Sequence, residues 1–138
     1  MFRANGQTNI DFWLLAHLGY VALRQDNQAR ARSLFIEIQQ GFKESQSKIG
    51  VIYALEGLAS LAVLQNQHGS AARLFAWANA TRIAIGDVRP PVEQADVDRD
   101  LVTIYAQLDE ASFAAAQAAG RAMTMDEAIT YALESTHE

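Results

Sequence analysis

Three aspartates that alternate with other residues come closest in this sequence to a set of metal ligands. Asp96, Asp98 and Asp100 stand at every second position, as oxygen ligands do at the start of a calcium-binding loop. The glycine and the distal glutamate that complete such a loop are missing here. The segment has the pattern of a helix, on which Asp96 and Asp100 share a face and Asp98 points away. We therefore expect a solvated helix face on which Asp96 pairs with Arg99, and no calcium site.

Other residue types that carry catalysis are scattered or absent. The histidines, His17, His68 and His137, have neither of the spacings typical of zinc ligands on a helix. The chain contains no cysteine, which excludes a thiolate zinc site and a cysteine nucleophile. Neither a phosphate-binding Gly-x-x-x-x-Gly-Lys loop nor a Gly-x-Ser-x-Gly nucleophile turn occurs, and no glutamate has an obvious carboxylate partner that would tune it as an acid. The sequence predicts a protein that is not an enzyme and holds no metal and no cofactor.

The charge balance is acidic, with a formal net charge of −5. Because proteins that bind nucleic acids rely on lysine and arginine to displace counterions, this balance argues against a direct nucleic-acid partner. The N-terminus lacks the apolar core of a signal peptide. The most apolar run, residues 51–64, is interrupted by Glu56 and is too short to cross a bilayer. We expect a cytoplasmic protein with no membrane partner, and the lack of cysteine fits a reducing compartment.

A self-match at a spacing of 40 residues shows how the chain is organised. Seven identical pairs fall in one register, and the small residue Gly19 falls opposite the small residue Ala59. Chance could match one or two such positions, so the register indicates a duplicated structural unit. Fixed periods of roughly 20–50 residues are typical of stacked architectures that offer a surface to a partner. The pairs are Leu15 with Leu55, Leu18 with Leu58, Ala22 with Ala62, Gln25 with Gln65, Ala31 with Ala71, Leu34 with Leu74 and Phe35 with Phe75.

The composition favours helices in these units. Half of the residues are hydrophobic, alanine is abundant, and proline occurs only at Pro90 and Pro91, which favours helix over strand. Apolar residues recur at helical spacing, and no segment alternates for long enough to indicate a sheet. We predict one all-α domain over residues 1–138 with about seven helices. Its parts are a first helical hairpin over about 8–42, a second over about 48–86, and capping helices over about 91–134.

Local signals mark three of the helix ends. Gly86 stands where a left-handed residue would end the fourth helix. Asp109 can cap the sixth helix. Thr124 and Glu127 have the spacing of a capping box, in which the threonine oxygen accepts from the glutamate amide and the glutamate side chain reaches back.

The pattern inside each unit is specific. A large residue is followed by a large–small pair in the first helix, and then by alanine and an aromatic residue in the second. A small residue at Gly19 or Ala59 lets the paired helix approach closely, and Phe35 and Phe75 would fill the space between neighbouring units. The residues are Leu15, Leu18, Gly19, Ala22, Ala31, Phe35 and Ile38 in the first unit, and Leu55, Leu58, Ala59, Ala62, Ala71, Phe75 and Ala78 in the second.

These spacings resemble the tetratricopeptide repeat. The resemblance implies a right-handed stack of antiparallel helical hairpins with a C-terminal capping segment. Both units lack the proline usually found at the end of that repeat, and their offset of 40 residues exceeds the nominal length of about 34. Longer helices or loops are therefore expected.

A further series of segments is similar to the C-terminal end of large bacterial regulators, in which a nucleotide-hydrolysing switch module is joined to tetratricopeptide repeats and some members carry LuxR-like DNA-binding domains. The resemblance implies a sensor or protein-interaction segment of a signalling or transcriptional regulator, with a protein, a peptide or another domain of the regulator as partner. This chain contains no nucleotide-binding motif and no convincing helix-turn-helix, so neither activity carries over. The segments are residues 54–59, 71–75, 90–91, 113–116, 120–123 and 126–128.

The tetratricopeptide resemblance also implies a binding face. The first helix of each hairpin would line the concave side of the stack, where aromatic residues rimmed by charges suit the capture of a helix or an extended peptide. An alternative is that Trp13 and Tyr53 simply complete the core. The residues implied at this face are Trp13, Ala16, Tyr20 and Arg24 from the first hairpin, and Tyr53, Glu56, Ser60 and Leu64 from the second.

Two alternatives concern other surfaces. A pocket between the second hairpin and the tail helices would make the chain a small-molecule sensor of such a regulator, with Trp77 beside the pocket. The N-terminal face of the first hairpin has no cap, and Phe2, Phe12 and Trp13 lie near it. This face is a candidate surface for a homodimer with a second copy of the chain.

Overall fold

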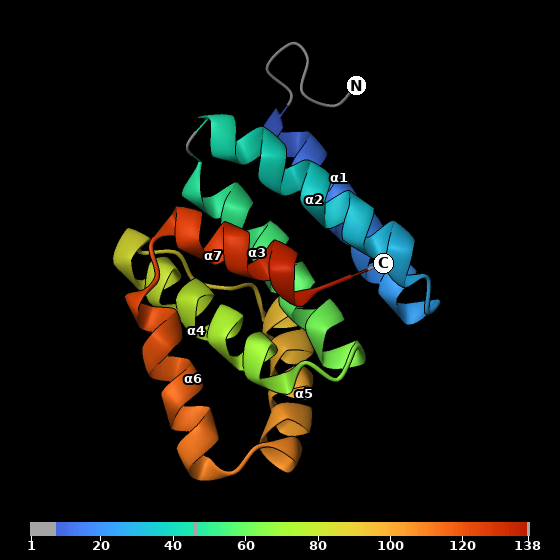
Figure 1. Ribbon diagram of the computed structural model, residues 1–138. Helices are drawn as coiled ribbons and strands as arrows, with labels where there is room; N and C mark the ends of the chain where they lie inside the picture. Colours follow the sequence, from blue (N-terminus) through green and yellow to red (C-terminus); the bar gives the residue numbers. More distant parts are fainter. Residues whose placement is uncertain (1–7, 46, 138) are drawn as a thin grey trace.

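The computed structural model describes residues 8–45 and 47–137, and the side chains of residues 14–43 and 47–137 (Figure 1). Within these residues the chain forms seven helices and no strand, which confirms the prediction of an all-helical protein with about seven helices. The helices are α1 (Thr8–Arg24), α2 (Gln28–Ser45), α3 (Lys48–Leu64), α4 (His68–Ile85), α5 (Pro91–Gln107), α6 (Glu110–Ala122) and α7 (Met125–Ser135).

The duplication reappears in the helix bounds. The bounds of α1 and α3 differ by 40 residues at both ends, and so do the bounds of α2 and α4. The two hairpin turns match as well, because Asp26 and Asn66 both adopt left-handed backbone angles, with φ of 58° and 61°. Aspartate and asparagine tolerate this conformation better than other non-glycine residues. The two units are therefore alike in helix length and in turn geometry.

Aromatic rings and glycines set the close approach of the first three helices. The ring of Phe35 lies between Gly19 of α1 and Gly57 of α3, and a Cβ atom on Gly19 would stand only 2.6 Å from it. A Cβ atom on Gly57 would come closer still, well inside van der Waals contact. Phe42 lies against Gly50 in the same way. The α2–α3 seam is thus filled by two rings that reach the backbone of α3.

Helix α3 is buried on every side. Fourteen consecutive residues, 50–63, are buried, and α1, α2, α4, α5 and α7 all pack against this helix. Figure 1 shows α3 at the centre of the molecule, behind α7 in this view, with α2 above it and α5 below it. A helix that is apolar all round must be enclosed, so the other helices are arranged around α3.

The tail helices depart from the repeat. Helix α6 lies along α4, and Gly120 allows the contact, because a Cβ atom there would stand 2.9 Å from the Cβ of Ala76. Helix α7 lies between α2 and α4, whereas α5 and α6 diverge from the turn that joins them (Figure 1). At the far end of α7, the Arg32 side chain of α2 donates to Thr136 Oγ1 and to the Leu133 carbonyl oxygen, both at 3.0 Å.

The three predicted helix ends are confirmed. Gly86 ends α4 in the left-handed conformation, with φ of 73°. The Asp109 carboxylate accepts from the Ser112 amide at 2.7 Å at the start of α6, which lowers the pKa of Asp109. The Thr124 hydroxyl accepts from the Glu127 amide at 3.1 Å, and the Glu127 carboxylate accepts from the Thr124 amide at 2.8 Å.

Substitution of Gly57 by alanine should destabilise the protein, although alanine is the better helix former. The added Cβ would overlap the Phe35 ring, and overpacking of this kind typically costs about 1–3 kcal/mol. Gly69 is the matched control, because it lies in α4 with no atom within 4 Å of an added Cβ. Gly69→Ala, in the first turn of α4, should therefore be neutral or stabilising by less than about 1 kcal/mol. Equilibrium unfolding in urea measures both changes, and equal effects of the two substitutions would contradict the close approach of α2 and α3.

Candidate functional site

Helix α5 lies along the face of α3 that the tetratricopeptide resemblance implies to be concave. The Ser60 hydroxyl of α3 donates to Asp100 Oδ2 of α5 at 2.6 Å, and Tyr53 is hydrogen-bonded to Glu93. On α3 the two contacting residues, Tyr53 and Ser60, are seven positions apart. Their partners on α5, Glu93 and Asp100, are also seven positions apart and come in the same order. Because seven residues make about two helical turns, α5 runs parallel to α3 over this contact.

A buried carboxylate in the middle of α3, Glu56, binds the end of α4 and the segment that precedes α5. Glu56 is 3% exposed, and the guanidinium of Arg82 meets it with two hydrogen bonds, from Nη2 to Oε1 at 2.9 Å and from Nε to Oε2 at 3.1 Å. The second cation is Arg89, which donates from Nε at 3.1 Å and from Nη2 to Glu56 Oε2. Both arginines are buried as well, Arg82 at 3% and Arg89 at 9% exposed.

Neighbouring polar side chains provide further ion-pair and hydrogen-bond partners for the two arginines. Arg82 also forms an ion pair with Asp87. Arg89 donates to Asn79 Oδ1 at 2.9 Å and to Gln94 Oε1 at 2.8 Å. Burial alone would lower the pKa of Arg82, but its hydrogen bonds to Glu56 and the Glu56 charge raise the pKa and keep the guanidinium ionised. The cluster ties α3, the end of α4 and the segment before α5 together.

The carboxylates that α5 places against α3 are not fully compensated. Burial raises the pKa of Asp100, against the lowering effect of the hydrogen bond from Ser60. Burial also raises the pKa of Glu93, against the hydrogen bond from Tyr53 and the charge of Arg82. Burial, with the Glu93 charge, raises the pKa of Tyr53 to about 12. The contact of α5 with α3 therefore desolvates two acids without a full counter-charge at either.

Beyond these contacts a groove stays open between α1, α3 and α5. It encloses about 230 Å³ and combines apolar side chains with charges of both signs. On α5, Asp96 and Arg99 form an ion pair, as the sequence predicts. The groove is lined by Tyr20, Leu23 and Arg24 of α1, Ser60 and Leu64 of α3, and Asp96, Arg99 and Asp100 of α5.

The structure brings four of the eight predicted binding residues together. They are Tyr20, Arg24, Ser60 and Leu64, which line this groove. The Tyr20 ring also packs edge-on against Phe35, with centroids 5.3 Å apart, and burial raises its pKa well above the ordinary value.

Three of the other predicted residues are buried and do not line this groove. Ala16 is buried in the core. Tyr53 and Glu56 are buried beneath α5 and the segment that precedes it. The side chain of Trp13 lies outside the described part of the structure, as do residue Phe2 and the side chain of Phe12 from the predicted dimer face.

Sequence reasoning missed Arg82, Arg89 and Asp100 as parts of this site. A signal for the two arginines was available, because Glu56 is the single charge in an apolar run and a buried carboxylate requires a cation. Which cations would serve depends on the path of the chain after α4. That path is a long-range property of the fold.

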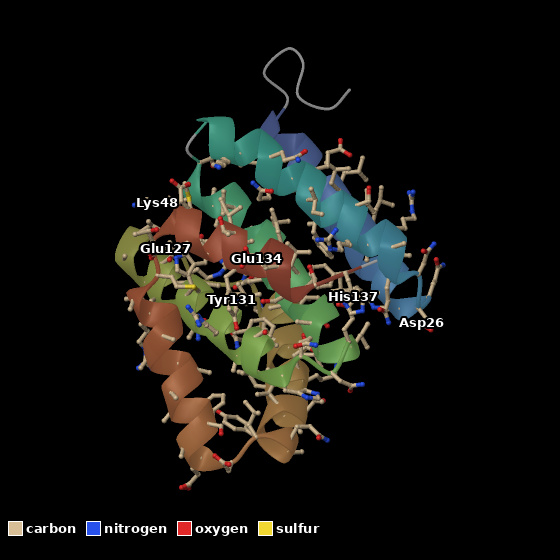
Figure 2. All side chains as sticks on the ribbon, viewed as in Figure 1. Asp26, Lys48, Glu127, Tyr131, Glu134 and His137 are labelled. Carbon is tan, nitrogen blue, oxygen red and sulfur yellow. The ribbon has the colours of Figure 1, made fainter. Side chains whose placement is uncertain are left out.

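Two further cavities lie between the second hairpin and the tail helices. The larger, of about 620 Å³, is lined by residues of α4, α6 and α7. In it the Arg73 guanidinium lies 4.2 Å from the centre of the Tyr131 ring, and Arg73 Nε donates to Met123 Sδ at 3.4 Å. Figure 2 shows Glu127, Tyr131 and Glu134 in succession along α7, with Tyr131 reaching toward α4. The smaller cavity, of about 280 Å³, is lined in part by Trp77.

Comparison of the chain with protein-family models, with curated proteins and with solved structures gives no match. The chemistry must therefore be judged from the side chains themselves. In the part of the chain that the structure describes, no three histidine, cysteine, aspartate or glutamate side chains gather where they could hold a metal ion. Among the same residues, no helix has both the length and the apolar character needed to cross a bilayer.

Replacement of Glu56 by glutamine should strongly destabilise the protein. It would leave the buried charges of Arg82 and Arg89 without their shared counter-ion, and loss of one member of a buried ion pair typically costs about 3–5 kcal/mol. The matched control is Asp96→Asn, which removes a pair whose Arg99 side chain is 68% exposed and should cost at most about 1 kcal/mol. Urea unfolding monitored by circular dichroism compares the two variants. A small loss for Glu56→Gln would contradict the role of this cluster as an anchor.

Proposed function

We propose that the chain is a non-catalytic, cytoplasmic protein-interaction module of a bacterial signalling or transcriptional regulator. Its partner is a helix or an extended peptide, supplied by another protein or by another domain of the regulator. The partner binds at the concave face, in the groove between α1, α3 and α5. The resemblance of the repeats to the tetratricopeptide pattern supports a right-handed stack, and the order of the tail segments supports the link to regulators.

One observation carries this proposal. The face of α3 that carries Ser60, which the tetratricopeptide resemblance implies to be concave, holds helix α5, and an open groove lies beside this contact. In that groove Leu64 is 46% exposed and stands beside the charges of Arg24 and Arg99. An exposed apolar side chain rimmed by polar groups is typical of a protein interface.

A charge placed in the groove should weaken partner binding. Leu64→Arg would put a third cation beside Arg24 and Arg99, whereas Ile83→Arg alters an exposed position on α4, outside the residues that line the groove. The tagged chain and both variants are used to capture partners from a bacterial lysate, and the affinity of the captured protein is then measured by calorimetry. We expect Leu64→Arg to bind at least about tenfold more weakly, a loss of about 1.4 kcal/mol. Equal binding by both variants would assign the partner to another surface.

A specific observation also favours the second candidate, small-molecule sensing. The cavity of about 620 Å³ falls within the range of about 300–1,000 Å³ that is typical of ligand sites. It combines an aromatic ring, a cation and several carboxylates. Such a mixture could orient a small polar ligand between the second hairpin and the tail helices.

A bulky residue in this cavity should abolish ligand binding. Thr130 lines the cavity, and Thr103 of α5 is an exposed threonine outside it. In a thermal-shift screen of metabolites, a ligand of this site should raise the melting temperature of the wild type and of Thr103→Trp but not of Thr130→Trp. A ligand that stabilises all three proteins equally would bind elsewhere.

A further inference from the structure

The two seams of the repeat differ in chemistry. In the first seam, Phe42 of α2 packs against Gly50 of α3. The residue 40 positions after Phe42 is Arg82. Helices α3 and α5 are both 17 residues long, with bounds displaced by 43 residues, so Glu93 stands where Gly50 stands in α3. The α4–α5 seam therefore carries charges where the α2–α3 seam carries a ring and a glycine.

Helix α5 is also weakly buried. Only Val97 and Ile104 of its residues are buried, compared with fourteen residues of α3. Its outer face exposes Val92, Val102 and Tyr105. A helix with few buried apolar side chains belongs to the part of a fold that opens at low free-energy cost.

The side chains of α3 beneath α5 determine which features another helix would need in order to bind at the same surface. Tyr53 and Ser60 present hydroxyl groups two turns apart on α3, and α5 meets them with Glu93 and Asp100. An incoming helix therefore needs hydrogen-bond acceptors seven residues apart on one face. The two buried residues of α5, four residues after each acceptor, show that it also needs apolar residues at those positions.

We propose that the face of α3 and α4 beneath α5 is the binding site of a partner helix with this pattern, and that α5 occupies the site until the partner displaces it. The inference rests on the function proposed above and names its ligand: an amphipathic helix of another protein with acceptors seven residues apart and apolar residues four positions after each. Helix α5 stays tethered at both ends, by Arg89 to Glu56 and by α6 to α4. It therefore competes at high effective concentration.

The first test measures competition by α5. The probe is a fluorescent synthetic peptide of residues 90–108, titrated into the full chain. Ile104 is fully buried and Val102 is 68% exposed on the same helix, so Ile104→Asp should release α5 and Val102→Asp should not. Because a site that is rarely vacant has a proportionally reduced apparent affinity, Ile104→Asp should bind the peptide at least about tenfold more tightly than the wild type. Unchanged affinity, with amide exchange of α1–α4 as in the wild type, would overturn the proposal.

The second test does not depend on a destabilising substitution. Because the chain has no cysteine, Ser60→Cys and Asp100→Cys together introduce a single pair of thiols at the α3–α5 contact. Linking them with dibromobimane fixes α5 in place, and Asp100→Cys alone, labelled with monobromobimane, is the control. The linked protein should lose binding of the peptide, and equal binding by linked and unlinked protein would overturn the proposal.

Different experimental results would overturn the displacement of α5 and the function proposed for the concave face. A partner that the linked protein binds at wild-type affinity, while Leu64→Arg does not, overturns the displacement of α5 and leaves the concave-face function standing. A partner that binds Leu64→Arg and Ile83→Arg equally overturns the concave-face function itself.

Discussion

Helix α3 has no side that faces water, because residues 50–63 are buried without a break. Each neighbouring helix packs against part of this surface. Glu56 adds an electrostatic demand in the middle of the helix, since a buried carboxylate is stable only with a cation and hydrogen bonds around it. Arg82 and Arg89 meet that demand. In doing so they fix the end of α4 and the direction in which the chain leaves it.

The duplicated hairpins therefore differ in what holds them to the next helix. The first hairpin offers Phe35 and Phe42, which press into glycines of α3 and leave no room for movement. The second offers Arg82 at the position of Phe42, and Phe75 is buried without any comparable glycine in α5. Close packing holds the first seam in one arrangement, whereas the second seam is joined by buried ion pairs and hydrogen bonds. The two units share their backbone, but the second contact surface is polar where the first is apolar.

The sequence predicts the local features of this fold well. The two matching hairpins are visible as a self-match at a spacing of 40 residues. The helix ends at Gly86 and Thr124 depend on contacts between near neighbours, so the pattern alone locates them. The position of α5 against α3 depends on which cations reach Glu56, and that of α6 depends on how closely Gly120 approaches α4. These are long-range events with no periodic signature. For the same reason, the tetratricopeptide resemblance implies a face with Tyr20 and Leu64, which line the groove, but not the α5 residues that complete it.

The contact of Arg32 with Thr136 joins residues 104 positions apart. During synthesis on the ribosome, each hairpin can close as soon as its own residues emerge, since its contacts are local. Helix α7 cannot bridge α2 and α4 until the chain has been made as far as Thr136. The nascent protein therefore passes through a stage in which α3 lacks the cover of α7 and part of its apolar surface is exposed to water.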